Sequence, residues 1–102
     1  MYRLRYLDGA LKDLHAIKKH IVNESHSEDI ALGFLKLLLR RCEWLAIFPG
    51  KPGRLRPDLA TGIYSFPHDN CIICFQYEDN ELQIVTITER HRDLEALFEN
   101  EQ

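Results

Sequence analysis

"CIICFQYEDNELQIVTIT", residues 71–88, decides the fold of this chain of 102 residues. Two runs rich in β-branched and aromatic residues, CIICFQYE and ELQIVTIT, flank Asp79 and Asn80. Runs of this composition form strands, and Asp and Asn tolerate the positive φ angles that a two-residue hairpin turn requires. We therefore predict an antiparallel hairpin over this stretch.

The segments on either side of the hairpin extend the predicted sheet. "TGIYSFPH", residues 61–68, is a third β-rich run, and Asp69 and Asn70 separate it from the hairpin as a second tight turn. At the N-terminus, "YRLRYL" alternates apolar residues with arginines, which is the period of a half-buried strand. The sequence thus predicts a three-stranded antiparallel meander and a separate N-terminal strand.

Two helices are predicted between the first strand and the meander. Asp8 can cap the first, whose apolar residues recur at spacings of three and four. Ser27, followed by two acidic residues, favours the start of a second helix that runs from about Glu28 to Ile47 and stops before Pro49. The apolar stripe of the first helix consists of Ala10, Leu14, Ile17 and Ile21.

The chain closes with a short helix, for which Asp93 is the expected cap. Together these elements predict an α+β fold: a small curved antiparallel β-sheet, made of the N-terminal strand and the meander, packed against a helical hairpin. At this length we expect residues 1–102 to form one domain.

The charge balance restricts the kind of partner. A net charge of -3 and a pI near 5.9 argue against the basic surface of a nonspecific nucleic-acid binder. The sequence shows no membrane-spanning stretch and no apolar signal-peptide core, so we expect a cytosolic protein.

Cations nevertheless gather in one loop, "GKPGRLRPDL", residues 50–59. Here Arg54 and Arg56 could join Arg90 and Arg92, which follow the last strand, in a local positive patch for a phosphate or acidic target. A second interpretation is that the loop arginines stabilise the turn by bonding backbone carbonyls and Asp58.

Cys71 and Cys74 form a CxxC sequence that invites a metal interpretation. In a strand, however, an odd separation places the two side chains on opposite faces. No second pair at zinc spacing follows. We therefore expect buried thiols, no metal and no cofactor.

The ordered set of segments resembles the RelE/ParE family of toxins from bacterial toxin–antitoxin systems. The resemblance covers nearly the whole chain, and its loop, strand entry and tail are similar to the ParE branch. The segments that carry it are ALKDLHAI, FPGKPGRLRPDL, GIYSFP, CIICFQY and ITERHRDLEALF.

The resemblance implies a toxin that inhibits DNA gyrase by binding, without turnover. It also implies a cognate antitoxin that wraps its C-terminal segment around the toxin and that alone links the toxin to operator DNA. The target-binding residues would be Arg54, Arg56, Arg90 and Arg92. A domain this small can hardly bury all its large apolar side chains, so an antitoxin groove is expected at Trp44, Leu94, Leu97 and Phe98.

Two alternatives remain open at this point. One is a RelE-like, ribosome-dependent mRNA endonuclease, in which His68 or His91 would move protons and the arginines would hold the scissile phosphate. Its site would comprise Arg54, Arg56, Arg90 and His91, but the tail after Asp93 lacks the late tyrosine of such nucleases. The other is an attenuated member that only binds antitoxin, suggested by departures from the family pattern at Tyr64, Cys71 and Glu89.

Overall fold

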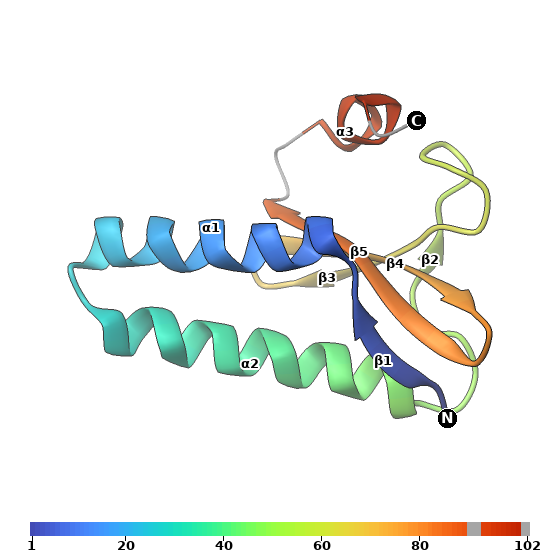
Figure 1. Cartoon of the computed structure of the whole chain (residues 1–102), viewed down its shortest axis with the longest axis horizontal. Coiled ribbons are helices and arrows are strands. Elements are labelled where there is room, and N and C mark those ends of the chain that lie inside the picture. The colour runs from blue at the N-terminus through green and yellow to red at the C-terminus, as the bar shows by residue number, and fades with distance from the viewer. Residues whose placement is uncertain (90–92, 101–102) are drawn as a thin grey trace.

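The computed structural model describes residues 1–89 and 93–100. Its helical hairpin lies on one side of a five-stranded sheet, and a short third helix lies apart from the hairpin (Figure 1). The elements are β1 (Arg3–Tyr6), α1 (Asp8–Ser25), α2 (Glu28–Ile47), β2 (Arg54–Leu55), β3 (Tyr64–His68), β4 (Cys71–Glu78), β5 (Glu81–Glu89) and α3 (Leu94–Asn100).

The predicted meander is confirmed as β3, β4 and β5, with antiparallel pairing throughout. Asp79 and Asn80 form the hairpin turn with φ angles of 50° and 64°, and Asp69 has a φ of 50° in the other turn. These left-handed conformations explain why short polar residues stand at both turns.

The sheet differs from the prediction at both edges, because its strand order is β1-β5-β4-β3-β2. The N-terminal strand β1 runs parallel to β5, with Arg3 opposite Glu81 and Tyr6 opposite Ile84, so the sheet is mixed rather than wholly antiparallel. The alternation of β1 is satisfied in either direction, and no tight turn joins β1 to β5 to fix one. The second difference is β2, two residues of the predicted loop that pair with β3.

The helix boundaries follow local chemistry. The Ser27 side chain accepts a hydrogen bond of 3.2 Å from the N–H of Ile30, and Asp93 accepts one of 3.2 Å from the N–H of Ala96, so both predicted caps are confirmed. Asp8 is not a cap: Leu7 holds that position without a side-chain bond, and Asp8 lies in the first turn, where the helix dipole favours a carboxylate. Within residues 1–89 and 93–100, no helix combines the length and the apolar character that a membrane span needs.

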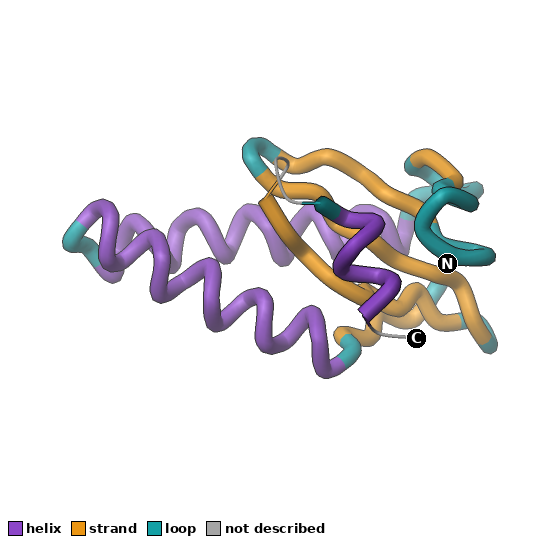
Figure 2. Tube along the Cα trace, turned by 90° about the horizontal axis from the view of Figure 1, so that it is seen from above, coloured by secondary structure: helices purple, strands orange, loops and turns teal. Residues whose placement is uncertain are grey.

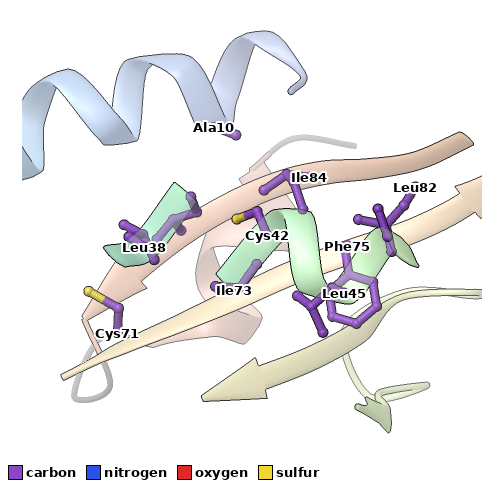
Figure 3. Close-up of a cluster of buried hydrophobic side chains, with 11 residues drawn as sticks. Ala10, Leu38, Cys42, Leu45, Cys71, Ile73, Phe75, Leu82 and Ile84 are labelled. Atoms are coloured by element: carbon purple, nitrogen blue, oxygen red, sulfur yellow. The ribbon is translucent and has the colours of Figure 1, made fainter. Parts of the chain in front are cut away.

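Strand β4 separates two apolar clusters, because its side chains alternate. Ile73 and Phe75 face the helical hairpin and are fully buried against Leu38 and Leu45 of α2 (Figure 3). Cys74 points to the opposite face, into a smaller cluster beneath α3. Figure 2 shows α3 lying across the strands on that side. Both faces of the central strand are therefore covered.

A carboxylate links α1 to β5 beyond the end of β1. The same oxygen of Asp13 accepts 2.6 Å from the Thr86 hydroxyl and 2.9 Å from the Ile87 N–H. β1 pairs with β5 only as far as Ile84, and Val85 is the extra residue of a β-bulge. Asp13 thus satisfies a backbone donor that the strand pairing leaves open. Its spacing from Ala10 and Ile17, three and four residues, places it on the buried side of α1, a signal that the sequence prediction did not use.

Replacing Asp13 by Ala should lower the free energy of unfolding by about 2–3 kcal/mol, because a charge-assisted acceptor is lost and the Ile87 N–H is left without its partner. Urea denaturation followed by circular dichroism measures this. Lys12→Ala, at the exposed neighbouring position, should stay within about 0.5 kcal/mol of the parent. An equally small effect for Asp13→Ala would show that the carboxylate does not hold α1 in place.

Candidate functional site

Arg54 lies at the edge of the sheet, beside a pocket on the face that carries α3. It pairs with Ser65 across β2 and β3, and Ser65 pairs with Cys74, whose side chain faces the α3 cluster. The pocket has a volume of about 390 Å³, and we call it the Arg54 pocket; it is lined by Gly53, Arg54, Ser65, Phe66, Pro67 and Ile72. Arg54 is exposed and forms no ion pair with any described residue. Its guanidinium is therefore available to an acidic or phosphate group that also contacts the apolar pocket wall.

Arg56 is occupied inside the loop. Its Nε and Nη2 donate to the two carboxylate oxygens of Asp58 at 3.1 and 2.9 Å, and its Nη1 lies 3.4 Å from the Ser65 hydroxyl. This two-point bond raises the pKa of Arg56 and lowers the pKa of the Asp58 carboxyl. The alternative role considered for this residue, a bond to Asp58 within the turn, is thus present.

The third cation of the loop, Lys51, points away from Arg54 and Arg56, toward Tyr77. Its Nζ lies 5.1 Å from the ring centroid of Tyr77, and Tyr77 packs with the core between sheet and hairpin. The three cations that crowd the loop in sequence therefore diverge in space. Of these three, Arg54 alone has neither an ion pair nor a ring contact with a described side chain, although its charge helps to lower the pKa of the Asp58 carboxyl.

Gly53 fixes the path of the chain into β2. Its φ is +100°, and a Cβ at this position would lie 2.9 Å from the Ser65 carbonyl oxygen and 2.9 Å from the Phe75 ring. Both the backbone conformation and the space exclude a side chain. Gly53 is thereby a condition for bringing Arg54 to Ser65.

His68 does not join Arg54. It pairs with Cys71, on the side of the sheet that faces the hairpin, and its ring lies 6.2 Å from that of Phe34. Its Nε2 is 3.6 Å from the Asp69 carboxylate. Arg54 and Ser65 belong to the opposite face, so the proton-transfer pair considered for a nuclease is not assembled from these two residues.

Arg90, His91 and Arg92 lie outside the described residues, so their part in the patch stays a prediction. The last described residue before them is Glu89, which pairs with Cys71, and Cys71 pairs with His68. That end of β5 is two strand spacings, about 10 Å, from the end of β3.

The predicted antitoxin residues separate onto two faces. Trp44 is half-buried on α2, with its ring 5.5 Å from Phe66 and 4.8 Å from Phe48. Leu94 and Phe98 are buried under α3 at 7% and 5% exposure, and Leu97 is half-buried beside them. One continuous groove cannot contain all four residues in this conformation, and their role in binding stays a prediction.

The two cysteines of the CxxC sequence lie on opposite faces, as the strand alternation predicts: Cys71 belongs to the core under the hairpin and Cys74 to the cluster under α3. Within the described part of the chain, no three His, Cys, Asp or Glu side chains are arranged to hold a metal. Burial raises the pKa of the Cys42 thiol to about 11 and that of Cys74 to about 12.

Comparison with known proteins adds family and fold. A family model described as the ParE toxin of the type II toxin–antitoxin system parDE matches residues 4–94. Among solved structures, the chromosomal ParDE toxin–antitoxin system from P. aeruginosa is similar with a TM-score of 0.75 at 22% identity, covering 87% of this chain and 96% of that one. No curated protein sequence matches.

Two RelE-type structures are similar with lower scores. The toxin–antitoxin complex RelBE2 from Mycobacterium tuberculosis has a TM-score of 0.53 at 18% identity, over 87% of this chain and 98% of that one. The isolated E. coli RelE toxin has a TM-score of 0.54 at 16% identity, over 98% and 95%. At these identities the likeness concerns the fold.

Gly53→Ala should lower the free energy of unfolding by about 1–3 kcal/mol, because the new methyl group meets the Ser65 carbonyl at a strained φ. Gly33→Ala is the matched control. No atom lies within 4 Å of a Cβ at this exposed position in α2, so it should raise stability by about 0.5–1 kcal/mol. Thermal or urea unfolding of both variants measures these changes. An unchanged free energy of unfolding for Gly53→Ala would contradict the close approach of Gly53 to the Ser65 carbonyl.

The thiols of Cys42 and Cys74 should resist iodoacetamide at about pH 8, because both are buried and carry raised pKa values. Mass spectrometry of the native protein should find them unmodified, whereas the same protein in urea should be alkylated at both. Rapid labelling under native conditions would contradict the burial described here.

Proposed function

The chain belongs to the ParE toxin family of type II toxin–antitoxin systems, and from this premise we propose that it inhibits DNA gyrase by binding and that a cognate antitoxin neutralises it. Its contact with operator DNA would be indirect, through the antitoxin. Because gyrase acts on chromosomal DNA, the site of action would be the cytoplasm.

The Arg54 pocket carries the proposal. It combines one exposed guanidinium, which forms no ion pair with a described carboxylate, with a concave wall that includes Pro67 and Ile72. A single cation beside an apolar hollow suits one acidic or phosphate group at a defined position on a protein–DNA complex. A net charge of -3 would disfavour binding along DNA in general.

Arg56 would support this contact without making it. Its bonds to Asp58 and Ser65 hold the loop that presents Arg54. We therefore assign Arg54 as the contact residue and Arg56 as a positioning residue. Arg90 and Arg92 are proposed as further cations of the same surface.

Binding without turnover is favoured over RNA cleavage. General acid–base cleavage needs a proton-transferring group within hydrogen-bond reach of the cation-held phosphate. Among the described residues, His68 is on the far side of the sheet from Arg54, packed against Phe34. Of the two histidines considered for proton transfer, the nuclease alternative is thus left with His91.

Arg54→Ala should weaken gyrase inhibition, raising the protein concentration needed for half-inhibition of supercoiling by tenfold or more, while leaving the urea midpoint unchanged. Lys19→Ala, which removes an exposed cation on α1, is the control and should inhibit like the parent. Purified protein and gyrase suffice for the assay.

Three other outcomes would contradict part or all of the proposed function. Equal inhibition by Arg54→Ala would remove the pocket from the contact surface. Growth arrest with intact supercoiling and cleaved mRNA would establish the ribosome-dependent nuclease instead. A folded protein that neither inhibits gyrase nor arrests growth would be the attenuated, antitoxin-binding member.

A further inference from the structure

One face of α2 carries a stripe of large side chains that the fold covers only in part, since Phe34, Arg41 and Trp44 are half-buried. Its members recur at alternating spacings of four and three residues, so they lie in line along the helix. Ile30, Leu37 and Phe48 are exposed at 57%, 54% and 39%, although all three are apolar. We call this the α2 stripe: Ile30, Phe34, Leu37, Arg41, Trp44 and Phe48.

The stripe is flanked by hollows at two points. Near its middle, Leu37 and Trp44 line a shallow pocket of about 390 Å³ together with Arg40, Arg41, His68 and Asp69. Near its N-terminal end, Ile30 and Phe34 line a second pocket of about 220 Å³ with Ile17 and Ile21 of α1. Asn70, Cys71 and Glu89 complete this second pocket from the sheet side. In both overall views the tip of the helical hairpin projects past the strands (Figures 1 and 2).

The charges of the central pocket are unbalanced. No described carboxylate lies within ion-pair distance of Arg40 or Arg41. The Arg41 guanidinium is held in place by aromatic rings, 5.0 Å from the centroid of Trp44 and 5.5 Å from that of Phe66. Asp69 contributes one negative charge to the lining, against two guanidinium groups.

A buried polar atom also lacks a partner there. The Nε2 of His68 is shielded from solvent and makes no hydrogen bond within the described chain, although the Asp69 carboxylate stands 3.6 Å away. Buried polar atoms normally find partners. The pocket therefore offers two cations, one of them held by aromatic rings, and a polar atom without a hydrogen bond, beside apolar side chains.

We propose that the α2 stripe is a docking surface for an acidic amphipathic helix of a partner protein, with a carboxylate of that helix bound by Arg40 and Arg41. Apolar side chains of the helix would contact Leu37, Ile30 and the pocket beside Phe34. That this partner is the antitoxin rests on the proposed function. That the stripe binds an acidic helix rests only on its exposed apolar residues and its arginines.

The pattern of the stripe favours a helical peptide over a free anion. Ile30 and Leu37 are seven residues, about 10 Å, apart along α2, which matches the repeat of apolar side chains on one face of a second helix. A phosphate or a nucleic acid would use Arg40 and Arg41 but would leave the exposed apolar members uncovered. Lys36, exposed one turn before Arg40, adds a third cation for an acidic segment.

Trp44 reports on this surface directly, because it is the only tryptophan of the chain. The probes are two tryptophan-free synthetic peptides of about 20 residues, long enough to span the stripe as a helix. One carries Leu at helical spacing with Glu on its flanks, and its twin has Lys in place of every Glu. The acidic peptide should shift Trp44 emission saturably, and the basic twin should not.

Arg40→Ala/Arg41→Ala should weaken binding of the acidic peptide by tenfold or more. Lys12→Ala/Lys19→Ala, which removes the same amount of charge from exposed positions of α1, should bind like the parent. Because Arg41 packs against Trp44, a charge reversal at exposed Arg40 alone, Arg40→Glu, provides a variant that keeps this packing and should also lose binding.

The proposal is overturned if neither peptide binds, if both bind equally, or if the arginine variants bind as tightly as the parent. Inorganic phosphate that competes fully with the acidic peptide would make the pocket an anion site and overturn the helical occupant. Arg40→Glu should still inhibit gyrase, since Arg54 lies on the other face. Peptide binding by a protein that does not inhibit gyrase would retain the docking surface and reject the proposed target.

Discussion

The structure depends on a strand that is buried on both faces. In β4, Ile73 and Phe75 enter the core under the helical hairpin, whereas Cys74 enters the cluster under α3. Alternation of side chains along a strand makes this possible only if apolar cover is present on both sides. The hairpin supplies one cover, and α3 with Leu59 and Ile63 supplies the other.

Most of the fold could be predicted from the sequence because its signals are local. The hairpin turn at Asp79 and Asn80, the cap at Ser27 and the span Glu28–Ile47 each follow from residues within a few positions. The direction of β1 could not be predicted in this way, because its partner β5 lies at the far end of the chain. The hydrogen bonds of Asp13 could not be predicted for a similar reason, because its partners, Thr86 and Ile87, are 73 and 74 residues away in the sequence.

The residue types of the candidate site could be predicted from the sequence, but the partners of each side chain could not. The sequence identifies a loop rich in cations, but not that Lys51 turns to Tyr77 and Arg56 to Asp58 while Arg54 stays available. Likewise, apolar surplus on α2 and α3 was evident, yet only strand alternation combined with the position of α3 shows that Trp44 and Phe98 face different sides. The two proposed surfaces, around Arg54 and along α2, therefore have different lining residues, although the Phe66 ring both lines the Arg54 pocket and contacts Arg41.

The parallel pairing of β1 with β5 has a consequence for synthesis. Within the described residues, β1 has β5 as its sole strand neighbour, and α1 is fastened to the same strand through Asp13. The ribosome synthesises β1 and both long helices before β5, and contacts of such high sequence separation form slowly. The nascent chain must therefore remain without its completed sheet until Glu89 has emerged. The folded shape is thus completed only after the last strand of the sheet, β5, has been synthesised.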